Sequence, residues 1–137
     1  MSLEKKTELG DVKISDQVIA NIITKTMSAA DYNEKIWPAT LKGRQIGVLP
    51  KIVDAEFASN IIVELDDNDT VILEFSVITR FGVSIRRITR RLSDQIHDDI
   101  KYSLGLNASM ITINIAGVKS RHIARRNTKA VYKYEAV

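Results

Sequence analysis

The sequence contains no cysteine, which excludes disulfide bonds, thiolate zinc sites and a cysteine nucleophile, and which fits a reducing cytosol. None of its apolar runs approaches the roughly 20 residues that a helix needs to cross a bilayer. The first ten residues, MSLEKKTELG, lack the apolar segment of a secretory signal. We therefore expect a cytoplasmic protein that has no membrane span of its own.

Residues suited to catalysis or metal binding are also scarce. The two histidines, His97 and His122, have no cysteine beside them, and neither a phosphate-binding glycine loop nor a nucleophile elbow appears. Asp94, His97 and Asp98 could share a helix face around a metal, but His97 is more simply interpreted as a polar-face residue. The DDND turn at 66–69 lacks the glycine and the distal glutamate of an EF-hand loop. We expect no enzymatic activity, no cofactor and no metal site.

What the chain does have is an uneven distribution of charge. Residues 1–79 hold eight Lys and Arg against thirteen Asp and Glu, whereas residues 80–137 hold twelve against four, within a net charge of +3. The first part is therefore acidic and the second part is basic. Such a division indicates a basic surface for an anionic partner, or complementary parts that attract each other within or between molecules, or two solvated faces of one domain.

The periodicity of the apolar residues predicts a two-layer α+β domain over residues 10–118. Alternating apolar residues predict strands, and apolar residues spaced by three and four predict two amphipathic helices. Ser15 and Ser84 are expected to cap the helix N-termini and Gly105 a C-terminus. The expected order is strand 10–14, helix 16–30, hairpin strands 60–65 and 71–78, helix 85–104 and strand 111–115. We expect this β-α-β-β-α-β chain to pack both helices on one face of a small sheet.

Three segments fall outside this pattern. Residues 1–9 are polar and predict a flexible N-terminus, while residues 119–137 form a basic C-terminal extension whose VYKY pattern fits an edge strand or a partner-binding tail. Prolines and glycines make residues 31–59 an irregular connection with one short strand near 45–49. Within it, Trp37 is either an interaction anchor for a partner or a plug at the edge of the core.

Basic residues gather in two places, the start of the second expected helix and the C-terminal extension. Four arginines crowd the first helical turns, where the helix dipole disfavours each cation by about 0.3–1 kcal/mol. This placement requires an anionic compensator, which could be Asp94 one turn further on, an acidic protein surface, a phosphate backbone or an anionic lipid surface. The candidate residues for binding a partner or an anion are Arg86, Arg87, Arg90, Arg91, Lys119, Arg121, Arg125 and Arg126.

The stretches GDVKISDQVIANII, FSVITRFGVSIRRITRRLSDQIHDDIKYSLGL and MITINIAGV follow a pattern of core positions and turns. A short strand and a helix precede a strand that ends in a Phe-Gly-Val turn; a helix, a Gly-Leu break and a β-rich segment ending in Gly-Val follow. Over residues 10–30 and 60–118 this pattern resembles the alkaline shock protein family of bacterial envelope stress response proteins. The chain departs from it in the longer 31–59 connection and in the arginine-rich start of the second helix.

The resemblance implies a non-enzymatic cytoplasmic protein that forms homo-oligomers and reaches the inner face of the membrane through a membrane-anchored protein partner. It brings no catalytic residues with it. The alternative is a nucleic-acid or anionic-surface binding module that uses the helix arginines and the basic C-terminal extension. The first hypothesis predicts oligomers that salt weakens. The second predicts binding of polyanions that charge reversal at Arg87 and Arg91 abolishes.

Overall fold

The computed structural model of the chain describes residues 2–7, 10–29, 31–46, 56–66 and 70–135. Its long helices are α1 (Asp16–Met27) and α3 (Ile85–Leu104), and a further helical turn includes residues 56–58. Its strands are β1 (Ser2–Thr7), β2 (Gly10–Ser15), β3 (Ile36–Ala39), β4 (Ile62–Leu65), β5 (Val71–Arg80), β6 (Ala108–Lys119) and β7 (Ile123–Lys133).

The main sheet is built around β5. Strands β3 and β4 pair antiparallel with different parts of one edge of β5, β6 pairs parallel with its other edge, and β7 pairs antiparallel with β6. A parallel pair requires a crossover connection, and α3 supplies it between β5 and β6. The mixed sheet with its helices confirms the α+β class that the sequence predicts.

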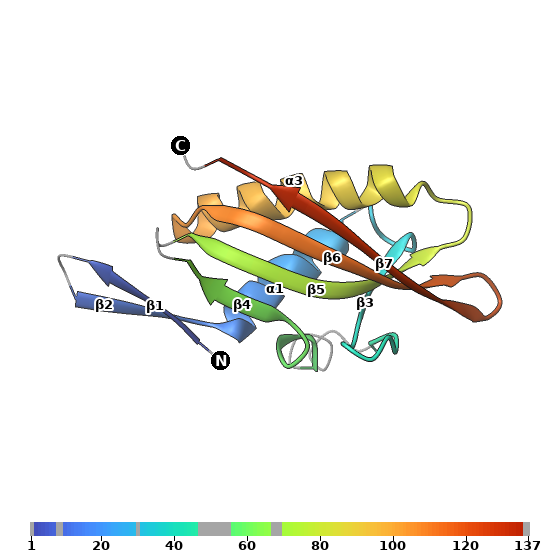
Figure 1. The fold of residues 1–137 in the computed structure, drawn as a ribbon, viewed down its shortest axis with the longest axis horizontal. Coiled ribbons are helices and arrows are strands. Elements are labelled where there is room, and N and C mark those ends of the chain that lie inside the picture. Colours follow the sequence, from blue (N-terminus) through green and yellow to red (C-terminus); the bar gives the residue numbers. More distant parts are fainter. Residues whose placement is uncertain (1, 8–9, 30, 47–55, 67–69, 136–137) are drawn as a thin grey trace.

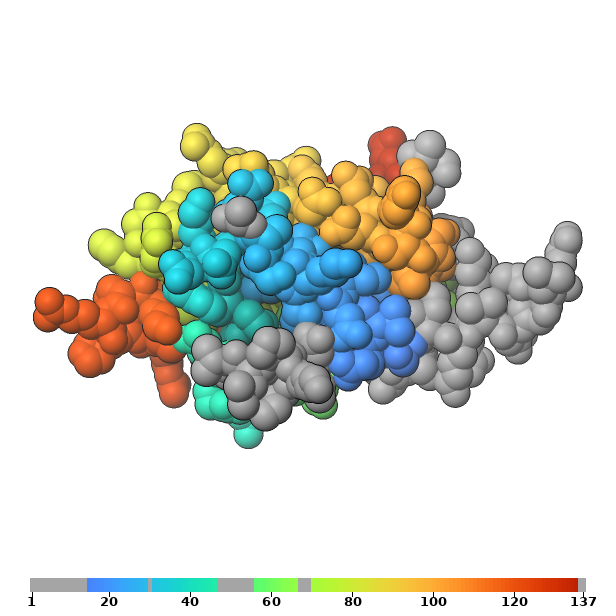
Figure 2. Space-filling model, turned by 180° about the vertical axis from the view of Figure 1, so that it is seen from behind, coloured from blue at the N-terminus to red at the C-terminus, as the bar shows by residue number. Residues whose placement is uncertain are grey.

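Both long helices cover the same face of this sheet, as predicted, and they make up part of the surface of the molecule when it is seen from behind (Figures 1 and 2). The core lies between the helices and the sheet, and alternate residues of each strand point into it. Val63, Phe75 and Ile113 from three neighbouring strands are fully buried there. Leu92 and Ile96 of α3 are buried in the same cluster.

Local signals set the limits of the helices. The Ser15 and Ser84 hydroxyls accept hydrogen bonds from the amides of Val18 and Arg87, both at 3.3 Å, so each serine caps a helix N-terminus. Helix α3 ends at Gly105, whose φ of 66° lies in the left-handed region that favours glycine. These three predicted caps are confirmed, whereas α1 ends at Met27, before the predicted limit at residue 30.

The N-terminal strands differ from the prediction. The strand expected at 10–14 is present as β2, but it pairs with β1 in a separate two-stranded sheet and not with the main sheet. Strand β1 thus occupies most of the segment 1–9 for which the sequence predicts a flexible N-terminus. Because only two residues separate these strands, pairing them closes a much smaller loop than joining β2 to the strands of the main sheet, which lie further along the chain.

The C-terminal segment is an edge strand of the main sheet and not an extension beyond a domain 10–118. Strand β7 pairs with β6 from Lys119↔Ile123 to Met110↔Lys133. Tyr132 and Tyr134, near its end, pack against the core cluster. The burial of these two rings explains why the VYKY segment forms an edge strand, which is one of the two predicted alternatives.

The strand of the 31–59 connection also lies elsewhere than predicted. It is β3, at 36–39, and not a strand near 45–49. In the latter segment Gln45 makes a single bridge to Ala39, and residues 47–49 lie outside the described part of the chain. At the level of sequence, Pro38 argues against a strand at 36–39. The proline is tolerated in β3 because this strand lies at the edge of the sheet.

Candidate interaction surfaces

The four arginines of α3 are all exposed, and the structure divides them into two pairs. Arg90 Nε lies 3.5 Å from Asp94 Oδ2, and an Arg91 guanidinium nitrogen lies 3.5 Å from Asp31 Oδ2. Arg90 also lies 5.3 Å from the centre of the Tyr132 ring in a cation–π contact. These two arginines therefore have compensators within the chain, although such exposed ion pairs stabilise a fold by only about 0–1 kcal/mol.

The other two arginines face solvent. Arg86 and Arg87 lie on the first turn of α3, which contains no acidic residue. No carboxylate among the described residues pairs with either guanidinium group. Their charge adds to the positive end of the helix dipole, which strengthens the local attraction for anions. Their role in anion binding stays a prediction.

Two tyrosines hold the end of β7 against α3. The Tyr134 hydroxyl donates to Asp94 Oδ1 at 2.6 Å and lies 2.7 Å from Ser93 Oγ. The Tyr134 ring stacks on His97 with ring centres 4.2 Å apart, and the Tyr132 hydroxyl lies 2.7 Å from Thr89 Oγ1. Burial, followed by the hydrogen bond to Asp94, raises the pKa of Tyr134 to about 12.

One end of the molecule gathers cations, of which the arginines are exposed and Lys119 is half-buried. Residues 81–84, between β5 and α3, lie beside the turn between β6 and β7, because the Phe81 amide donates to the Lys119 carbonyl at 2.8 Å. Figure 2 shows both turns protruding at the same end, the first in yellow-green and the second in orange. Phe81 itself is 72% exposed, which its position directly after an apolar strand does not predict. We call this the basic end, and its residues are Arg80, Phe81, Arg86, Arg87, Lys119 and Arg121.

Lys119 and Trp37 contact each other. Lys119 Nζ lies 4.9 Å from the centre of the Trp37 ring and donates to Gln45 Oε1 at 2.9 Å. The Trp37 side chain, on edge strand β3, is half-buried. These contacts give both residues an intramolecular role. The predictions that Lys119 binds an anion and that Trp37 anchors a partner stay untested.

The face of the main sheet away from the helices is open, with no described helix or strand in front of it (Figure 1). The strand register places Glu64, Ile72, Met110 and Lys133 side by side in one row across it. The neighbouring row contains Ile62, Glu74, Thr112 and Val131. We call these two rows the open face. Its acidic residues lie on β4 and β5, its lysine lies on β7, and apolar residues lie between them.

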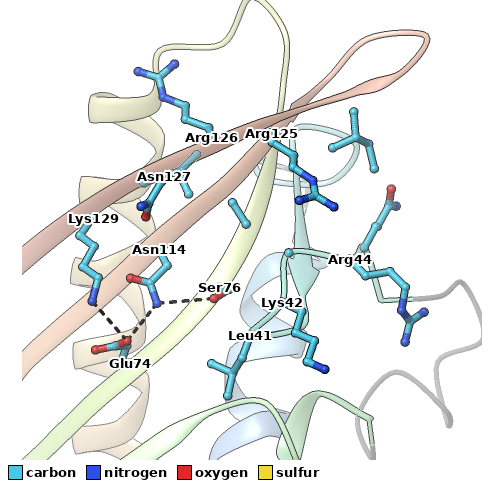
Figure 3. Close-up of a pocket in the computed structure, with 15 residues that line it drawn as sticks. Leu41, Lys42, Arg44, Glu74, Ser76, Asn114, Arg125, Arg126, Asn127 and Lys129 are labelled. Atoms are coloured by element: carbon cyan, nitrogen blue, oxygen red, sulfur yellow. Dashed lines mark hydrogen bonds and ion pairs between the residues drawn. The ribbon is translucent and has the colours of Figure 1, made fainter.

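A hollow of about 900 Å³ adjoins the open face, between the loop after β3 and the start of β7 (Figure 3). On its floor, Asn114 Nδ2 donates to Glu74 Oε2 at 3.0 Å, and Lys129 Nζ lies 3.9 Å from the same oxygen. The basic residues that line it are Lys42, Arg44, Arg125, Arg126 and Lys129.

The sequence predicts only part of this hollow. Arg125 and Arg126 of the basic C-terminal segment are predicted binding residues, whereas Lys42 and Arg44, which flank Gly43 in the irregular connection, are not. Arg44 is paired with a glutamate of the helical turn at 56–58. A basic pair around a turn glycine is too common a pattern to predict that the loop would face β7.

Metal binding and membrane crossing find no support in the described part of the chain. Within these ranges, His, Asp and Glu side chains do not gather in groups of three or more that could hold a metal ion. No helix among the same residues is both long enough and apolar enough to cross a membrane.

These observations define a class: a small α+β domain with a mixed sheet, helices on one sheet face, an open opposite face and a basic end. A sequence model of the alkaline shock protein 23 family, described as having a cell envelope-related function, matches residues 4–120, so the chain belongs to this family. The family predicted from the three sequence stretches is thereby confirmed, and membership gives the chain a cell envelope-related role. Neither a curated protein nor a solved structure matches the chain.

Proposed function

We propose that this chain is a non-enzymatic cytoplasmic protein that forms homo-oligomers through its open face and docks on a membrane-anchored protein partner in its envelope-related role. The observation that carries the proposal is the order of side chains across the open face. Acidic residues lie along one side, a lysine lies along the other, and apolar residues lie between them. Such a surface is complementary to a second copy of itself.

A twofold axis parallel to the strands would pair the open faces of two copies. This rotation lays β7 of one copy over β4 of the other, so Lys133 meets Glu64 and Met110 meets Ile72 across the contact. A twofold axis perpendicular to the strands would lay lysine over lysine and glutamate over glutamate, and like charges in contact disfavour association. The charge pattern therefore favours the parallel axis.

The size of the sheet face limits the strength of this contact. The open face is four strands wide, at ~4.8 Å per strand, and about as long as β5, at ~3.3 Å per residue. Its area is therefore about 600 Å² per copy. Stable specific interfaces bury about 800 Å² per partner. We therefore expect a dimer that dissociates on dilution. High salt should weaken it further, because its Lys–Glu pairs lie at the rim of the contact.

The hollow between the loop after β3 and the start of β7 is the surface that we assign to the protein partner. It begins at Glu74, in the second row of the open face, and extends from there toward the basic end. Its cations outnumber Glu74, which is its one acidic lining residue among those described. An acidic segment of a partner suits such a surface, because complementary charge speeds association and selects the partner. Nucleic-acid binding has less support. Single strands stack on several aromatic rings, and Phe81 is the one exposed aromatic residue described at the basic end.

Charge reversal tests self-association through the open face. Light scattering on a size-exclusion column, run across protein concentration, should show a dimer that becomes a monomer at high salt. Lys133→Glu and Glu64→Lys should each weaken the dimer by about tenfold, since each places like charges opposite each other twice per dimer. The double variant should restore the dimer.

Lys101→Glu is the matched control, because it makes the same charge change at an exposed position of α3, on the other side of the sheet. It should leave the dissociation constant unchanged. A chain that is monomeric at every concentration, or a double variant as weak as either single variant, would contradict the proposed contact.

A further inference from the structure

The basic end carries an apolar ring that neither the core nor the proposed dimer uses. Phe81 is 72% exposed although it follows directly on the buried strand β5. The hydrogen bond from its amide to the Lys119 carbonyl fixes this turn to the end of β6. Gly82 continues the same convex turn with a φ of 91°. A Cβ atom added at Gly82 would meet no atom within 4 Å beyond Gly82 itself and its chain neighbours. The ring is therefore held in solvent by an ordered backbone.

Exposed cations surround this ring in the fold. Arg80 precedes Phe81, Arg86 and Arg87 follow on the first turn of α3, and Arg121 lies in the adjacent turn between β6 and β7. No carboxylate of the described residues pairs with these four arginines. An exposed phenylalanine and four cations without a described carboxylate partner thus share one convex end.

We infer that the basic end binds the surface of an anionic lipid bilayer directly, with Phe81 entering the boundary between headgroups and acyl chains. The ring would leave water there, while the arginine side chains extend their guanidinium groups to the level of the lipid phosphates. The attraction to anionic headgroups adds up over the basic residues near the surface. This contact goes beyond the proposed function, in which a protein partner mediates any membrane association.

The shape of the basic end favours a lipid surface over other anionic partners. Single-stranded nucleic acid requires a groove lined by several stacking rings. An arginine cluster could also take an acidic peptide, but such a peptide gives the exposed Phe81 ring no apolar surroundings to enter. The basic end instead consists of two protruding turns (Figure 2). A bilayer surface requires only a convex cationic end with an apolar group that can enter it.

Sedimentation with lipid vesicles tests this inference. The full chain should bind phosphatidylcholine vesicles that contain about one third phosphatidylglycerol and should not bind vesicles of phosphatidylcholine alone. Phe81→Ala should weaken binding by about tenfold, because the ring no longer leaves water. Arg86→Glu combined with Arg121→Glu should abolish binding.

Two matched controls show whether binding depends on the position of these residues at the basic end or only on the loss of an aromatic ring and of positive charge. Tyr102→Ala removes an aromatic side chain that is 93% exposed near the far end of α3, and it should leave vesicle binding unchanged. Lys25→Glu combined with Lys101→Glu changes the net charge as much as the double arginine variant does, at exposed positions away from the basic end. This control should keep most of the binding. Circular dichroism of each variant checks that the fold is intact.

Three results would overturn the inference. The first is binding that does not depend on anionic lipid, and the second is binding to which Phe81→Ala makes no difference. The third is weaker binding to vesicles than to a single-stranded oligonucleotide, with the same dependence on the arginines, which would assign the basic end to nucleic acid. Each comparison is also made in the background of the Lys133→Glu variant, whose weaker binding should still depend on anionic lipid and on Phe81, so a failure of the proposed dimer can be told apart from a failure of this inference.

Discussion

Tyr134 contacts three side chains of α3, namely Ser93, Asp94 and His97. Ser93 is fully buried, so its hydroxyl depends on Tyr134 for a side-chain hydrogen bond. Removing one partner of a buried hydrogen bond costs about 1–3 kcal/mol, because the remaining group is left without its partner in a place that water does not reach. The edge strand β7 is therefore attached to the domain by specific bonds as well as by its backbone pairing with β6.

Tyr134→Phe should lower the free energy of unfolding in urea by about 1–3 kcal/mol at neutral pH. The wild-type protein should also lose stability as the pH rises from 10.0 toward 12, because the folded state holds the pKa of Tyr134 at about 12 and so favours the neutral hydroxyl. The variant should lose less over this range. Some loss will remain, since burial also raises the pKa of Tyr32.

Tyr102→Phe is the control for this change, because Tyr102 is almost fully exposed on the same helix. It should leave the urea midpoint within experimental error. Equal stability of the Tyr134→Phe variant and the wild-type protein would show that backbone pairing alone holds β7 in place.

Helix α3 depends on the residue that ends it. Gly105 has a φ of 66°, and its amide donates to the Lys101 carbonyl to close the last turn. Gly105→Ala should destabilise the fold by about 1–2 kcal/mol, because a side chain in the left-handed region approaches the neighbouring carbonyl. Gly105→Asn should cost less, since asparagine adopts this conformation more readily. Thermal unfolding of the two variants, measured side by side, checks the order, and an equal loss would rule out backbone strain as the cause.

The elements that the sequence predicts well are those set by neighbours along the chain. The apolar stripe of α3, its serine cap and its terminal glycine all lie within 84–105, so they can be read in one window. The hairpin of β4 and β5 is similarly local, and its antiparallel pairing confirms the prediction. Strand β3 was missed because its proline is acceptable only at a sheet edge, and an edge position is a property of the whole sheet.

The candidate surfaces follow from pairings that no single window contains. The arginines of α3 could be predicted as a cluster, but not that Arg91 would pair with Asp31, sixty positions away. The open face depends on the registers of β4, β5, β6 and β7 together, and a shift of one residue in any of them would change its composition. The proximity of Phe81 to the turn between β6 and β7 likewise requires the parallel pairing of β5 with β6.

For the molecule as a whole, the open face and the basic end are separate surfaces, and the proposed dimer relates them. An axis parallel to the strands leaves the strand direction unchanged, so both basic ends of the dimer point the same way. An axis perpendicular to the strands would point them in opposite directions. The orientation of the twofold axis therefore decides whether one dimer can place two basic ends on a single membrane.

A dimer with both basic ends on one side should bind anionic vesicles more tightly than a monomer without joining vesicles to each other. Once one basic end of a dimer is bound, the second binds at a high effective concentration. Lys133→Glu weakens the dimer and should therefore weaken vesicle binding by at least about tenfold, although Lys133 lies outside the basic end. Turbidity should stay low for the wild-type protein at every ratio of protein to lipid. Glu64→Lys combined with Lys133→Glu should restore tight binding. Glu64→Lys alone should weaken binding although it adds positive charge, which separates loss of the dimer from loss of positive charge. Rapid clumping of vesicles by the wild-type dimer would show that its basic ends point in opposite directions, and the parallel axis would then be wrong.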